Sequence, residues 1–298
     1  MKLPALLSLV AWLCIPAIAC AEPPGISYIF PAGGRQGTEL DVRVGGFYLH
    51  DQAAWEMQPA GVVASPQLTR TERLWFEGPL IRQPASQQKE DYPQDYTAHL
   101  KIAADAAPGM RSWYAWNGQG VTPSLKFVVG NLPEVMEVES DGLPLPTHVE
   151  LPVTINGRIF PREDVDLWSF KAQAGQSITC NVAAESLGSP LEARLEILDA
   201  HGKQVAESGG QLQVDPAVQF TAPESGEYQV RICDRKFGGL QNHVYRLTIT
   251  ADAWVTAIFP LGGKRGHTAE VELSGQALPA TKLALTWPDE EPGIIEHA

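Results

Sequence analysis

The sequence lacks the short motifs that mark many enzymes. It contains no Gly-x-Ser-x-Gly elbow, no His-Glu-x-x-His, no Gly-Lys-Ser/Thr phosphate loop and no Cys-x-x-Cys. The seven histidines are scattered singly, so we expect lone ones such as His201 and His243 to be solvated. We therefore predict that the chain is not an enzyme and has no cofactor, although a triad assembled only in space stays open.

Positive charge is also scarce. The chain has 22 Lys and Arg against 35 Asp and Glu, a formal net charge of −13, and no basic stripe. Such a chain repels phosphate backbones, which argues against nucleic acid as a partner. The 298 residues have room for two domains or two and a part. High Gly and Pro (27 and 24) favour short strands and turns over long helices.

The N-terminus has the pattern of a signal peptide. Lys2 precedes an apolar run over residues 6–18, and Ala19 and Ala21 satisfy the small-x-small rule. We predict cleavage near Ala21 and a secreted, periplasmic or cell-surface protein. A lipid anchor on Cys20 is the alternative. The run is short for a membrane span, so none is expected after signal removal.

Two cysteines then remain, Cys180 and Cys233. In an exported protein such a pair suggests a disulfide. Strand alternation, however, places Cys180 inward with Ile178 and Val182, and Cys233 outward with Arg231. They should not meet without a bulge at one of them, and the disulfide stays an open alternative.

Period-2 alternation runs through the chain, and no stretch holds a helical period. The clearest case is the segment LEARLEILDAHG, which starts at Leu191. Apolar residues 191, 193, 195 and 197 alternate there with charged ones, and a turn ending in Gly202 follows. The chain is therefore predicted to be all-β, with tandem β-sandwich modules.

One passage occurs twice. Residues 29–49 and 258–278 share nine of 21 aligned positions, including an Ile-Phe-Pro opening and three of its following glycines. About 80 residues follow the first copy, whereas only about twenty follow the second. A half sandwich exposes its apolar face and strand edges. We expect a third module that is incomplete, either because the chain is a fragment or because a partner completes it.

Two family resemblances attach to these segments. The Pro-x-Gly-Gly-x-x-Gly opening with its later Val-x-Val-x-Gly resembles the immunoglobulin-like IPT/TIG modules of secreted and cell-surface proteins. Residues 148–250 resemble the bacterial pre-peptidase C-terminal (PPC) domain through EDVDLWSFKAQAGQSITCNV, LEILDAHGK, TAPESGEYQVRI and VYRLTIT. That resemblance implies a non-catalytic, jelly-roll-like sandwich appended to exported bacterial proteins. Some members bind calcium or matrix polymers.

The predicted organisation has five parts. They are a signal peptide (1–21), an IPT/TIG-like sandwich (22–130), an acidic Pro-containing linker (131–147), a PPC-like sandwich (148–250) and an incomplete IPT/TIG-like module (251–298).

Five carboxylates are candidate calcium ligands. Glu137, Glu139 and Asp141 lie in the linker, and Asp164 and Asp166 precede a strand. Hard oxygen ligands suit Ca²⁺. The alternative is that the linker charges are solvated and that the two aspartates cap a turn.

The segment RSWYAWNG supplies a candidate aromatic platform. Trp113 and Ala115 face one way, and Tyr114 and Trp116 face the other. If one face is core and the other bare, Tyr114 and Trp116 can stack on sugar rings. The alternative is that neighbouring strands cover both faces.

These observations predict a secreted, non-catalytic modular protein with a binding or spacer role at the cell surface or in the matrix. The expected partner is an extracellular polymer or protein. The alternatives are the accessory region of a larger exported peptidase or other hydrolase, and a polysaccharide-binding module.

Overall fold

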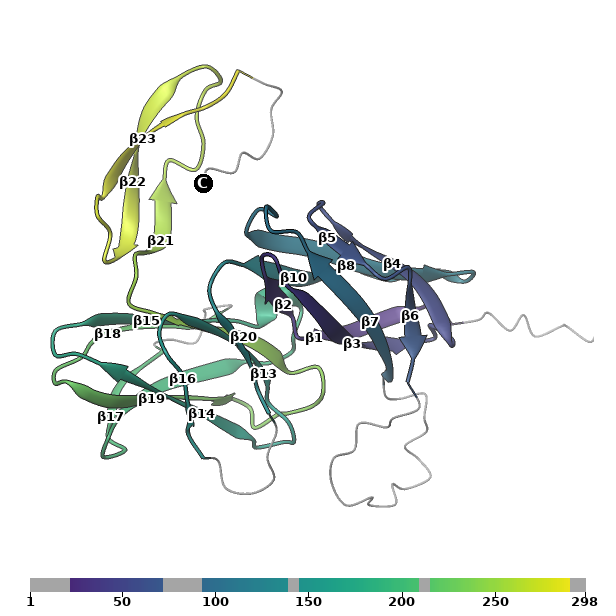
Figure 1. The fold of residues 1–298 in the computed structure, drawn as a ribbon, viewed down its shortest axis with the longest axis horizontal. Coiled ribbons are helices and arrows are strands. Elements are labelled where there is room, and N and C mark those ends of the chain that lie inside the picture. Colours follow the sequence, from purple (N-terminus) through teal and green to yellow (C-terminus); the bar gives the residue numbers. More distant parts are fainter. Residues whose placement is uncertain (1–21, 72–92, 139–144, 209–214, 290–298) are drawn as a thin grey trace, which may run out of the picture.

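The computed structural model describes residues 22–71, 93–138, 145–208 and 215–289, and it is all-β (Figure 1). The predicted signal peptide, with its cleavage site at Ala21 and the alternative anchor Cys20, lies outside the described residues. Within the described ranges, no helix is long and apolar enough to span a membrane. The predicted fold class is confirmed.

The first module is built from ten strands around one core. Their order is β1-β3-β7-β6-β4-β8-β10-β2, with β5 paired to β7 and β9 paired to β8. Tyr96, Leu100, Trp113 and Phe127 are fully buried in this core because they occupy the inward positions of alternating strands. The strands are β1 (Gly25–Phe30), β2 (Gly33–Arg35), β3 (Glu39–Phe47), β4 (Gln52–Gln58), β5 (Val62–Ala64), β6 (Gln67–Arg70), β7 (Gln94–Ile102), β8 (Gly109–Asn117), β9 (Gly120–Val121) and β10 (Leu125–Gly130).

The second module is a sandwich of two five-stranded sheets, ordered β11-β13-β20-β15-β18 and β12-β14-β19-β16-β17. Phe170, Phe220 and Tyr228 meet in its core, with ring centroids 5.4–6.4 Å apart. The elements are β11 (Glu134–Met136), β12 (Thr147–His148), β13 (Val153–Arg158), β14 (Val165–Ala172), β15 (Ser177–Ala183), the 3₁₀ turn η2 (Glu185–Leu187), β16 (Ala193–Asp199), β17 (Gln204–Glu207), β18 (Ala217–Thr221), β19 (Gly226–Asp234) and β20 (Val244–Thr250).

The segment 131–147 is more than the linker expected from its composition. Residues 134–136 form β11, which pairs in parallel with β13, and Val135 packs against the core of the second module. Residues 147–148 form β12, which pairs with β14. Backbone pairing and one partly buried valine thus outweigh the acidic, Pro-containing composition.

Cys180 and Cys233 are both free thiols. Cys180 lies in the core of the second module beside Ile178 and Val182, and burial raises the pKa of its thiol. Cys233 lies on β19, half-buried, opposite Arg194 of β16. The opposite orientations expected from the alternation keep the two sulfurs apart.

The third module is a three-stranded sheet of β21 (Trp254–Phe259), β22 (Thr268–Gln276) and β23 (Lys282–Thr286). Its β21–β22 pair reproduces the β1–β3 pair rung for rung, including the bulge near the start of the first strand. Ile258 is 37% exposed, whereas its counterpart Ile29 is 2% exposed. Val271 of the same sheet is fully buried, so the apolar side of this sheet is only partly exposed.

Candidate binding surfaces

The aromatic segment on β8 has one buried and one half-exposed face. Trp113 is fully buried, and its ring meets that of Trp55 edge-on at a centroid distance of 6.0 Å. Ala115 is buried on the same side. Tyr114 and Trp116 lie on the opposite side and are half-exposed, so the expected division of the strand into a core face and an outer face is seen in the structure.

The two outer rings are neighbours. Their centroids are 5.8 Å apart, and their planes are inclined by 39°. Trp116 lies opposite Ala54 of β4 and Val121 of β9. Val121 is 62% exposed, so the rings join a continuous half-apolar surface over three strands.

Polar groups from β4 border this ring pair. Tyr114 lies opposite Glu56, and its hydroxyl donates a hydrogen bond to the Glu56 carboxylate. The Gln58 amide donates to the same carboxylate oxygen over 2.6 Å. The bond to Glu56 raises the pKa of Tyr114. Beyond them, Lys126 of β10 donates to Ser112 Oγ over 2.7 Å.

The calcium candidates divide into two groups. Glu139 and Asp141 lie outside the described residues. Glu137, Asp164 and Asp166 lie close together where the chain enters the second module, and burial raises the pKa of all three carboxyls. The alternative from the sequence was that the linker carboxylates are solvated and that the two aspartates cap a turn. Asp164 does accept the backbone N–H groups of Phe160 and Val165 at the turn.

Asp166 differs from this expectation because it points into the core. It shares the inward face of β14 with Trp168, and its carboxyl accepts the Tyr245 hydroxyl over 2.7 Å. Tyr245 in turn accepts the Trp168 indole N–H over 3.1 Å. Asp166 and Glu137 are hydrogen-bonded to each other, and Glu137 also accepts the Arg158 backbone N–H over 2.8 Å. Because both carboxyls are buried, a state in which they share one proton is favoured over a state in which both are charged.

No cluster of three or more metal-ligating side chains within the described ranges is arranged to hold a metal ion. The oxygens of Glu137, Asp164 and Asp166 are instead committed to protein donors. The calcium site stays a prediction from the sequence. A rise in melting temperature on adding Ca²⁺, reversed by a chelator, would support it, and no shift at millimolar calcium would contradict it.

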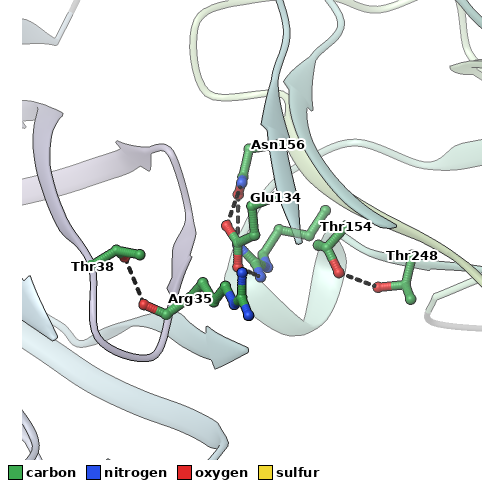
Figure 2. A network of polar contacts seen from close by, with 7 residues as sticks. Arg35, Thr38, Glu134, Thr154, Asn156 and Thr248 are labelled. Atoms are coloured by element: carbon green, nitrogen blue, oxygen red, sulfur yellow. Dashed lines mark hydrogen bonds and ion pairs between the residues drawn. The ribbon is translucent and has the colours of Figure 1, made fainter. Parts of the chain in front are cut away.

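The junction of the first two modules is a polar site that sequence reasoning missed. Arg246 of β20 is 4% exposed and pairs with Glu134 through Nη2–Oε1 at 2.7 Å and Nη1–Oε2 at 3.2 Å. Its Nη1 also donates to Asn156 Oδ1 over 2.6 Å. Figure 2 shows Glu134 and Asn156 together, with the Arg35 side chain of the first module extending toward them.

Gly33 of the first module makes room for this arginine. A Cβ at that position would lie 2.2 Å from the Arg246 guanidinium. Leu187 and Val244 of the second module are buried in the core of the first. The guanidinium of Arg158 lies over the Phe30 ring at 5.2 Å. The two modules therefore share a packed interface of apolar, aromatic and charged groups.

One histidine expectation is wrong. His201 is exposed, but His243 is only 8% exposed. Burial lowers the pKa of His243, and its Nδ1 accepts the Leu240 backbone N–H over 3.1 Å. It is a structural residue of the loop that precedes β20.

No protein-family model matches the chain, and no curated protein matches it in sequence. Solved structures with some likeness include the pre-peptidase C-terminal domain of collagenase from Bacillus anthracis, 15% identical over 37% of this chain and 100% of that chain, with a TM-score of 0.31. The adhesin InvE of Yersinia pseudotuberculosis is 11% identical over 89% of this chain and 58% of its own, with a TM-score of 0.23. A titin I-band fragment is 12% identical over 86% and 77%, with a TM-score of 0.22. These likenesses carry no argument about what the chain binds.

Proposed function

We propose that the chain is a non-catalytic binding region of an exported protein, in which the second module holds the first at a fixed orientation. The observation that carries this proposal is the junction itself. Arg246, which is 4% exposed and ion-paired with Glu134 inside the second module, packs against Gly33 of the first module, and Leu187 and Val244 of the second module complete the core of the first. Interfaces between domains that move freely are smaller and more polar.

A distance measurement tests the fixed orientation. Val63 of the first module and Lys203 of the second are exposed and can be replaced by labelled cysteines, with Cys233 changed to serine. We expect one narrow distance distribution in the otherwise unchanged chain and a broad one after Gly33→Leu, which fills the space of the Arg246 side chain. An equally broad distribution in both proteins would contradict the proposal.

Export is part of the same proposal and rests on the N-terminal sequence. The intact mass of the native protein should correspond to a chain that begins at Glu22. A mass that retains residues 1–21 would contradict cleavage, and an added lipid would favour the Cys20 anchor.

The alternative role is accessory to an exported peptidase or other hydrolase. Its support is the resemblance of residues 148–250 to PPC domains. An antibody against that range should then detect, in the exported fraction, a protein well above 32.4 kDa that carries a catalytic domain. Detection of the 32.4 kDa chain, less its signal, would favour the non-catalytic binding protein.

A further inference from the structure

We propose that the outer face of β4 and β8 is a binding site for a neutral, β-linked polysaccharide. This proposal rests on the proposed binding function and names its ligand class. The site consists of the Tyr114 and Trp116 rings with the Glu56 and Gln58 side chains beside them.

The ring pair supplies the stacking surface. The C–H faces of a pyranose ring are apolar and slightly electropositive, so they pack on the electron-rich faces of aromatic rings. Tyr114 and Trp116 are two residues apart on one strand, with centroids at 5.8 Å. This spacing is comparable to that of consecutive sugars in an extended β-linked chain. The other side of the same sheet holds the buried Trp113 and Trp55, whose rings meet edge-on.

The polar groups supply the hydroxyl recognition. Tyr114 Oη and Gln58 Nε2 both donate to Oε1 of Glu56, and these contacts hold the carboxylate at the edge of the rings. The other oxygen, Oε2, accepts no hydrogen bond from any described residue. An oriented carboxylate oxygen next to a stacking surface is an acceptor for sugar hydroxyls, and charge-assisted bonds of this kind are the stronger ones.

Charge and donor chemistry narrow the ligand class. Glu56 and the net charge of −13 disfavour an anionic polymer. A proline-rich peptide also binds aromatic surfaces, but it presents carbonyl acceptors and needs donors from the protein. The Glu56 carboxylate is an acceptor only, so it disfavours peptide carbonyls beside the rings. A neutral glycan, which offers hydroxyl donors on every residue, fits this surface better.

The test uses the full chain and defined glycans. Binding to insoluble cellulose, chitin and xylan is measured by co-sedimentation, and binding to cellohexaose and chitohexaose by calorimetry. We expect the unchanged chain to bind at least one of these. Trp116→Ala should weaken that binding about tenfold, and the double change Tyr114→Ala and Trp116→Ala should abolish it. Glu56→Gln should weaken binding while keeping the shape of the side chain.

Phe237→Ala is the matched control. It removes an aromatic side chain that is 71% exposed, on the second module, away from the proposed site, and binding should not change. Tyr114→Phe keeps the ring and removes one donor to Glu56, so it should retain most of the affinity and separates the contribution of the ring from that of the hydroxyl.

Three outcomes would overturn the proposal. They are no binding to any of these glycans, unchanged binding by the folded double variant, and binding of a proline-rich peptide in their place. None of these results affects the distance distribution between the modules, so failure of the glycan site is distinguishable from failure of the fixed orientation.

Discussion

Removal of the Arg246 side chain should destabilise the protein by about 3 kcal/mol. The guanidinium is 4% exposed and makes two contacts to Glu134 and one to Asn156. Removing one partner of a buried ion pair costs about 3–5 kcal/mol because the other charge is left uncompensated. The Glu134 side chain is 14% exposed, so water can reach it in the variant, which places the expected cost at the lower end.

Urea denaturation followed by tryptophan fluorescence measures this loss. With a slope of about 2 kcal/mol per molar, Arg246→Ala should lower the unfolding midpoint by about 1.5 M. Lys236→Ala, which removes a surface ion pair with Glu192, is the control and should cost about 0.5 kcal/mol. A loss below about 1 kcal/mol for Arg246→Ala would refute the reasoning, because the junction would then be open to water or held by other contacts.

Three further predictions concern the second module. Because burial raises the pKa of the Asp166 carboxyl well above its ordinary value, the folded state keeps a proton that the unfolded state releases near pH 4. The protonated Asp166 therefore contributes its full stabilisation of the folded state below about pH 4, and this stabilisation is lost as the pH rises through the folded-state pKa. Asp166→Asn should flatten the pH dependence of the melting temperature, and an unchanged slope would contradict this prediction. Tyr245→Phe should cost about 1–3 kcal/mol, seen in the same urea titration, since it removes the acceptor of the buried Trp168 indole N–H and one of the hydrogen-bond partners of Asp166. In a thiol-labelling time course without denaturant, Cys180 should stay unmodified and Cys233 should react slowly, both becoming fully reactive in urea; rapid labelling of Cys180 would show that the core opens.

The strand-level features of the fold could be predicted because alternation is a local signal. The sequence alone assigned Trp113 and Ala115 to one side of β8 and Tyr114 and Trp116 to the other, and the burial follows that division. On β16 the rule places Glu196 outward, and it does lie on the outer face. It is nevertheless only 2% exposed, because Arg194 and Arg231 cover it.

The polar interior could be predicted only in part. Asp166 lies two residues before Trp168, so period-2 alternation already places it on the inward face. Its partner Tyr245 is 79 residues further along the chain, and no local pattern indicates that meeting. The same holds for Glu134 and Arg246, which are 112 residues apart. The composition of residues 131–147 predicted a linker. The strand β11 within it could not be seen there because its pairing partner, β13, lies outside that range.

The register of the second module has a mechanical consequence. The chain enters the sheet at Glu134 and leaves it after β20, and both Glu134 and Thr248 are aligned with Thr154 of β13. The connections to the first and third modules therefore lie at the same end of one sheet. Tension between the outer modules would act on β11 and β20 from that end and open their rungs one after another, whereas a pull from opposite ends would strain all the rungs together. Under force the second module should act as a yielding link, and the ion pair between Glu134 of the first β11 rung and Arg246 is one of the contacts that break as β11 separates.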